Sequence, residues 1–256
     1  MKKALTLAAL FGAAALFALA PTARADDGPA RLQPVGWDSV TGSGKLQTES
    51  RAVTGFQAIS AQGSVNLVLR QGAREGVELR ADDNILPLIE TRVVDRGGVP
   101  TLEIGTKSGA SYSSRNPVVA TIDLISLRAL ALAGSSDVAC EALKSPALQV
   151  SVSGSGKLRL RQLDIDQLMV KVSGSGDVDF SGRATTLGLK IAGSGDANTR
   201  ALEADDVAVS VAGSGDVTVN ARKTLNVSVA GSGNVAYTGA AAVTSSVAGS
   251  GRVKKL

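Results

Sequence analysis

Histidine is absent from this chain of 256 residues, and Cys140 is its single cysteine. A zinc site built from cysteine and histidine is therefore excluded, as are catalytic triads and general bases that use histidine. A lone cysteine also cannot form an intramolecular disulfide. Aromatic residues make up only 3% of the sequence, so a core must be built from aliphatic side chains. We expect Cys140 to be a buried, unreactive thiol.

Without its N-terminal segment, the chain also has no excess of charge of one sign. Lys2 and Lys3 precede an apolar run, and Ala23-Arg24-Ala25 has the small-x-small pattern that signal peptidases cleave. We predict that residues 1–25 are a signal peptide and that the protein is exported, to the periplasm or outside the cell. The remaining chain has 24 basic and 23 acidic residues. This balance gives no reason to expect nucleic-acid binding, and no membrane span is expected after cleavage of the signal.

Glycine, by contrast, is abundant, and many of its 29 copies are periodic. The tripeptide Gly-Ser-Gly recurs every 18 to 20 residues in the second half of the chain. Its copies begin at Gly154, Gly174, Gly193, Gly213, Gly231 and Gly249, and Gly134-Ser135-Ser136 is a degenerate earlier copy. Such a period is typical of solenoids, in which each repeat stacks on its neighbours.

Apolar residues alternate with polar ones on both sides of these tripeptides. Val150 and Val152 precede one copy, and Leu158 follows it. This period of two is the signature of a strand with one buried face. One repeat is therefore expected to contain a strand, a tight corner, a second strand and a variable return such as residues 161–167. Glycine is expected at the corner because the backbone there must adopt φ > 0.

The common phase of all repeats favours stacked parallel coils over a meander of antiparallel hairpins. The sequence predicts an all-β protein with a right-handed single-stranded parallel β-helix over residues 126–256. Each turn is expected to hold about 20 residues and about five buried aliphatic side chains. Residues 51–125 are expected to form a less regular, β-rich head, and residues 26–50 a leader segment.

Both the head and the repeat resemble one bacterial family. The motifs that carry the likeness are Phe56-Gln57-Ala58-Ile59, Gly63-Ser64-Val65-Asn66-Leu67-Val68-Leu69, Ala81-Asp82-Asp83-Asn84-Ile85-Leu86 and Ser173-Gly174-Ser175-Gly176-Asp177-Val178. With them, roughly residues 51–256 resemble the head GIN domain proteins, also called putative auto-transporter adhesins. The resemblance implies bacterial export, a right-handed β-helix and no established enzymatic activity.

Aspartate follows the corner in three consecutive repeats, at Asp177, Asp196 and Asp216. In a β-helix these side chains would stack about 4.8 Å apart. Each carboxylate could cap its own turn. Together they could instead hold Ca²⁺ weakly, because Ca²⁺ accepts several carboxylate oxygens in flexible geometry. The capping role is favoured, and no cofactor is expected.

Enzyme motifs in the sequence are incomplete. Gly42-Ser43-Gly44-Lys45 resembles part of a phosphate-binding loop, but Leu46 stands where that loop needs serine or threonine. The Gly-x-Ser-x-Gly motif of hydrolases does not occur. Catalysis is therefore not expected.

The sequence predicts a non-enzymatic envelope protein, adhesin-like or ligand-binding, whose partner is a glycan or a cell-surface protein. One alternative is a Ca²⁺-dependent enzyme that degrades polysaccharides with the three stacked aspartates. Another is a purely structural or stress-linked component of the envelope. The sequence makes no prediction about the oligomeric state.

Overall fold

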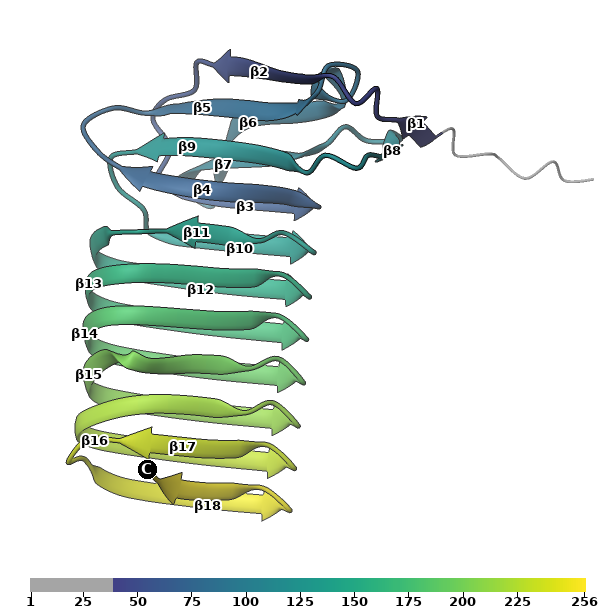
Figure 1. Ribbon diagram of the computed structural model, residues 1–256. Coiled ribbons are helices and arrows are strands. Elements are labelled where there is room, and N and C mark those ends of the chain that lie inside the picture. The colour runs from purple at the N-terminus through teal and green to yellow at the C-terminus, as the bar shows by residue number, and fades with distance from the viewer. Residues whose placement is uncertain (1–38) are drawn as a thin grey trace, which may run out of the picture. The chain divides into compact units, whose positions relative to one another are not determined.

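Parallel coils account for the second half of the chain in the computed structural model, which describes residues 39–256 (Figure 1). The coil strands are β10 (Ala129–Gly134), β11 (Val138–Cys140), β12 (Leu143–Gly154), β13 (Lys157–Gly174), β14 (Asp177–Gly193), β15 (Ala197–Gly213), β16 (Val217–Gly231), β17 (Asn234–Thr238), β18 (Ala242–Gly249) and β19 (Arg252–Lys255). Each strand pairs in parallel with its equivalent one turn away, so that Val152 lies opposite Val172. The parallel β-solenoid with about 20 residues per turn is confirmed.

The predicted signal peptide, residues 1–25, lies outside the described residues, as does the predicted leader up to residue 38. Among residues 39–256, no helix has the length and apolar character needed to cross a membrane.

The return segment differs from the sequence-based expectation. It is not a variable loop, because β13 and β14 each run as one continuous strand from one corner to the next. The chain bends within them at irregularities of pairing, such as the one between Leu160 and Leu163, where Gln162 has φ of 44°. The turn formed by β13 consequently buries seven side chains rather than about five. They are Leu158, Leu160, Leu163, Ile165, Leu168, Val170 and Val172, each at most 2% exposed.

Glycine is required at two places in each of the six Gly-Ser-Gly corners, for different reasons. The first glycine has the predicted positive φ, which is 135° at Gly213. The third glycine lies against the preceding corner, so that a Cβ on Gly215 would come within 2.1 Å of the carbonyl oxygen of Gly195. Between them, the backbone N–H of Ser214 donates to the carbonyl oxygen of Gly193 at 2.9 Å. The corners therefore stack backbone on backbone.

The head continues the stack, but out of chain order. Its elements are β1 (Ser39–Thr41), β2 (Leu46–Arg51), β3 (Ala58–Gly63), β4 (Val65–Gln71), β5 (Gly76–Asp82), η1 (Leu86–Leu88), β6 (Ile89–Arg96), β7 (Val99–Thr106), β8 (Ser111–Ser113) and β9 (Val118–Leu124). In parallel pairing, β3 lies between β10 and β7, and β4 lies between β11 and β9. The turn made by β3 and β4 is thus inserted between the turn made by β7 and β9 and the first coil. The expected less regular head is confirmed.

Antiparallel strands complete the head. β6 pairs with β7, and β5 pairs with β9 and with β2 (Figure 1). The last residues of the predicted leader therefore form β1 and most of β2. The Arg51 guanidinium fastens β2 by donating to the carbonyl oxygens of Ile89 and Leu86, at 2.6 and 3.1 Å.

Cys140 occupies a position in the core, as expected. It lies between Leu69 and Leu160 in the parallel register and is 2% exposed. Burial raises the pKa of its thiol, which disfavours the reactive thiolate at neutral pH.

The corner geometry predicts a large loss of stability in the variant Gly213→Ala. A Cβ there meets both a positive φ and the Gly193 carbonyl oxygen at 2.1 Å, so we expect destabilisation by at least about 2 kcal/mol. Gly72→Ala is the matched control, since no atom lies within 4 Å of its added Cβ. Urea unfolding followed by circular dichroism measures both. Equal stability of the two variants would contradict the stacked-corner geometry.

Candidate functional site

The three aspartates predicted to stack do form a column beside the corners. The backbone N–H of Asp216 donates to Asp196 Oδ1 at 2.8 Å, and that of Asp196 to Asp177 Oδ1 at 3.4 Å. Asn234 completes the series by donating its backbone N–H to Asp216 Oδ1 at 3.1 Å. Each carboxylate thus caps the next turn, whereas the sequence had suggested its own turn. Within residues 39–256, there is no group of three or more cysteine, aspartate or glutamate residues that could hold a metal ion.

A shallow pocket of about 250 Å³ lies on the same side of the coils as this column. Its lining brings basic and acidic side chains of successive turns together, among them Lys157, Arg159, Asp177 and Asp179. Opposite charges therefore lie in register across adjacent turns, with Lys157 opposite Asp177 and Arg159 opposite Asp179.

Over β15, β16 and β18, the broad outer surface formed by the strands that precede the corners carries small, mostly uncharged side chains, whereas Met169 and Lys190 lie in the same columns on β13 and β14. We call this surface the coil face, and its columns are Gly188, Ala208, Asn226 and Thr244; Ser210, Ser228 and Ser246; and Ala192, Ala212, Ala230 and Ala248. A shallow groove of about 270 Å³ crosses several turns of it. Regular spacing of backbone and side chains makes such a surface suited to extended contacts.

Ion pairs join successive turns near the bend of the coils. Arg183 and Lys144 both pair with Asp164, at 2.8 and 3.1 Å. Hydrogen bonds from these two residues hold the pKa of the Asp164 carboxyl far below its ordinary value, and the bond from Arg183 has the larger effect. The three residues belong to three successive turns, so the pairs support the stack.

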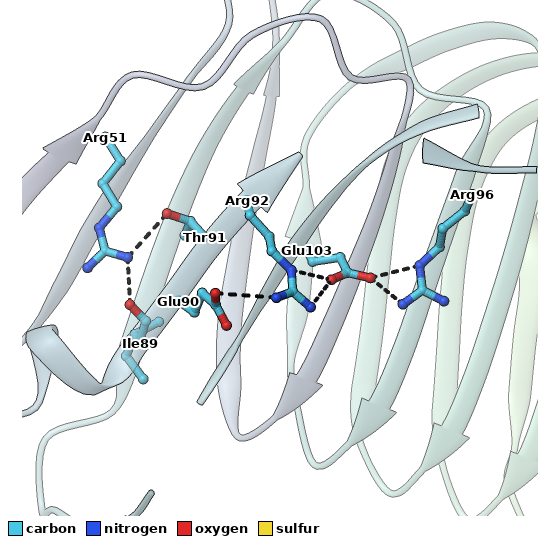
Figure 2. Close-up of polar contacts among 7 residues, drawn as sticks. All are labelled: Arg51, Ile89, Glu90, Thr91, Arg92, Arg96 and Glu103. Atoms are coloured by element: carbon cyan, nitrogen blue, oxygen red, sulfur yellow. Dashed lines mark hydrogen bonds and ion pairs between the residues drawn. The ribbon is translucent and has the colours of Figure 1, made fainter. Parts of the chain in front are cut away.

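The head carries a denser charged cluster on the β6–β7 hairpin, shown in Figure 2. Glu103 accepts hydrogen bonds from Arg92 Nε and from Arg96 Nε, each at 2.8 Å, and Arg92 also reaches Glu90 at 3.3 Å. The Glu103 side chain is only 13% exposed, while both arginine side chains are more than half exposed. Hydrogen bonds from Arg96 and Arg92 hold the pKa of Glu103 below its ordinary value.

The cluster borders a pocket of about 290 Å³ whose lining includes Gln62, Glu90, Arg92, Glu103 and Thr106. Sequence reasoning missed these residues, because Arg92 and Glu103 become neighbours only through the antiparallel register of β6 and β7. The sequence did offer one signal: Glu90 and Arg92 are charged and separated by one residue, as expected for neighbours on one face of a strand.

The motif Gly42-Ser43-Gly44-Lys45 has a structural position in the head. Ser43 donates its backbone N–H to Asn84 Oδ1 at 2.9 Å. The neighbouring Asp82 is 1% exposed and accepts hydrogen bonds from Ser114 Oγ at 2.6 Å and Asn116 Nδ2 at 2.7 Å. These bonds, Ser114 first, lower the pKa of Asp82. The segment that contains residues 42–45 therefore packs on the Asp82-Asp83-Asn84 turn of the head.

Comparison with known proteins matches residues 55–241, which include this turn, the Glu103 cluster and the aspartate column, to the family described as "Putative auto-transporter adhesin, head GIN domain". The chain belongs to this family.

Solved structures similar to this head GIN domain protein include two described as putative adhesins. The one from Bacteroides fragilis is 28% identical with a TM-score of 0.77, covering 85% of this chain and 100% of the other. The one from Parabacteroides distasonis is 25% identical with a TM-score of 0.67, covering 86% and 100%. A putative lipid binding protein from Parabacteroides distasonis, 22% identical with a TM-score of 0.68 over 85% and 99%, shares the fold. No curated protein matches the chain.

The hydrogen bonds of the aspartate column predict that it stabilises the fold modestly and that it does not bind Ca²⁺. Asp196→Ala removes the acceptor for the Asp216 N–H and should cost about 1 kcal/mol, whereas Asp196→Asn keeps an acceptor and should cost less. Urea unfolding with and without added CaCl₂ checks both points. A saturable stabilisation by Ca²⁺ that disappears in Asp196→Ala would show that the column is a metal site.

The Glu103 cluster predicts a defined dependence of stability on pH. Because the folded-state pKa of Glu103 is lowered, its contribution is complete above the unfolded pKa of about 4.3 and is lost as the pH falls through the folded pKa. Glu103→Gln should therefore be less stable than the wild type at neutral pH, and the difference should shrink on acidification. Unfolding midpoints from pH 7 downward measure this, with the exposed Glu78→Gln as control. A difference that stays constant with pH would argue against the cluster.

Proposed function

We propose that this protein is exported to the cell envelope and acts there as an adhesin-like binding protein whose partner is a glycan or a cell-surface protein. Membership of the head GIN domain family and the similarity to two putative adhesins support this role. The predicted signal peptide at residues 1–25 supports export.

The observation that carries the proposal is the sealed interior of the coils. Seven aliphatic side chains fill the turn made by β13, none more than 2% exposed, so this turn encloses no ligand. Binding must therefore use the outer surface, which stacking keeps rigid and regularly spaced. The coil face and the pockets of the head are the surfaces available for it.

The alternative of a Ca²⁺-dependent polysaccharide-degrading enzyme has no favourable observation. The carboxylates of Asp177 and Asp196 accept backbone N–H groups of the following turns, and they lie beside tight corners. Each of these carboxylates is thus committed through its Oδ1 to holding the next turn in the stack.

The direct test is a binding screen with the exported protein, immobilised and exposed to arrays of glycans, cell-wall fragments and envelope proteins. We expect saturable binding to at least one ligand class. Protein unfolded in urea should lose it, which separates recognition by the folded surface from adhesion of unfolded chain. An absence of saturable binding across all three ligand classes would refute the proposal.

A further inference from the structure

The turn made by β7 and β9 lacks the tight glycine corner that joins the two strands of each coil. Between β7 and β9, residues 107–117 replace the tight corner found in the coils. This excursion contains β8, which pairs in parallel with β1. It is anchored because Ser114 and Asn116 both donate to the buried carboxylate of Asp82, at 2.6 and 2.7 Å. The excursion is thus held in a defined position rather than left as an open loop.

An open pocket of about 490 Å³ lies between the excursion and the first corner of the head. We call it the head cavity, and it is lined by Gly63, Ser64, Thr106, Ala110, Ser111, Tyr112, Ser113 and Ser114. Six of these eight residues carry a hydroxyl group and none is charged. Its volume is within the range of small-molecule sites, roughly 300 to 1,000 Å³. Hydroxyl groups both donate and accept, so the lining suits a ligand that does the same.

Tyr112 is the aromatic residue of the lining. Its ring is partly buried and packs against the core. Its hydroxyl oxygen is shielded from solvent and has no hydrogen-bond partner within the described residues. Burial raises the pKa of Tyr112, an effect that the nearby Thr106 side chain opposes without meeting the geometry of a hydrogen bond. Because the hydroxyl oxygen is shielded, Tyr112 can offer a molecule in the pocket only its ring.

We propose that the head cavity binds one uncharged sugar ring, such as the terminal hexose of a glycan. A neutral hexose offers hydroxyl groups around its rim for the serine and threonine side chains, and apolar C–H faces for the tyrosine ring. A carboxylate or sulfate on the sugar would enter a lining that holds no opposite charge, so charged sugars are excluded. This inference rests on the proposed adhesin-like function and identifies its site and ligand class.

The experiment uses the two tyrosines of the chain, Tyr112 and Tyr237, as reporters. The exported protein is labelled with ¹³C-tyrosine and titrated separately with glucose, galactose, mannose and glucuronate while the ring resonances are recorded. Tyr237→Phe assigns the two sets of signals. We expect saturable shifts of Tyr112 with at least one neutral hexose, little change at Tyr237, which lies on β17, and no saturable shift with glucuronate.

Three variants separate a binding role from a structural one. Tyr112→Phe keeps the ring and removes only the shielded hydroxyl, so it should bind hexose as the wild type does. Ser113→Trp fills the cavity from an exposed position and should abolish binding. Ser232→Trp, at an exposed corner of the coils, is its control and should bind normally. Circular dichroism confirms that each variant is folded.

Three outcomes would overturn the inference: no Tyr112 response to any neutral hexose, an equal response to glucuronate, or unchanged hexose binding by folded Ser113→Trp. The proposed function is tested by separate results. Saturable array binding that is lost in Ser228→Arg, on the coil face, but kept in Ser113→Trp would support an adhesin-like protein and reject the head cavity as its site. Failure of the whole array would reject the proposed function itself.

Discussion

The contact of backbone with backbone at the corners is the constraint on which the rest of the structure depends. The carbonyl oxygen of one corner occupies the place where a Cβ of the next corner would be, as Gly193 does beneath Gly213 and Gly195 beneath Gly215. Only glycine allows this approach, and it fixes the phase of each turn relative to the preceding one. Once the phase is fixed, Val150, Val170 and equivalent residues stack in columns, and each coil strand from β12 to β16 finds parallel partners on both sides.

This constraint also separates the surface from the interior. Because the columns fill the coils with aliphatic side chains, chemistry is confined to the outside, where Asp196 and Asp164 serve neighbouring turns through hydrogen bonds and ion pairs. The head relaxes the rule in one place. By replacing a corner with residues 107–117, it gains the Tyr112 cavity, and the buried Asp82 supports the excursion. An adhesin-like protein built this way would combine a uniform stack with a specialised end.

Much of the coil could be predicted from the sequence because its local pattern and its global fold agree. The position of Gly154, the inward side chains of Val152 and Leu158 and the burial of Cys140 follow from periodicity alone. The prediction of a variable return was wrong. A bend at Gln162 shifts the alternation of buried and exposed residues by one position, so Leu163 and Ile165 do not fit a strict period of two. The order of turns in the head could not be deduced, since β3 pairs with β7 and β10 over long separations. For the same reason, the sequence did not indicate that Glu103 and Tyr112 line pockets.

Distances between spin labels along the corner column test the stacking most directly. With Cys140 replaced by alanine, cysteine pairs at Ser155 and Ser214, Ser155 and Ser232, and Ser155 and Ser250 place labels three, four and five turns apart. The stacked coils predict that the measured distance grows by about 4.8 Å with each additional turn. Distances that fail to increase from one pair to the next would contradict the stack.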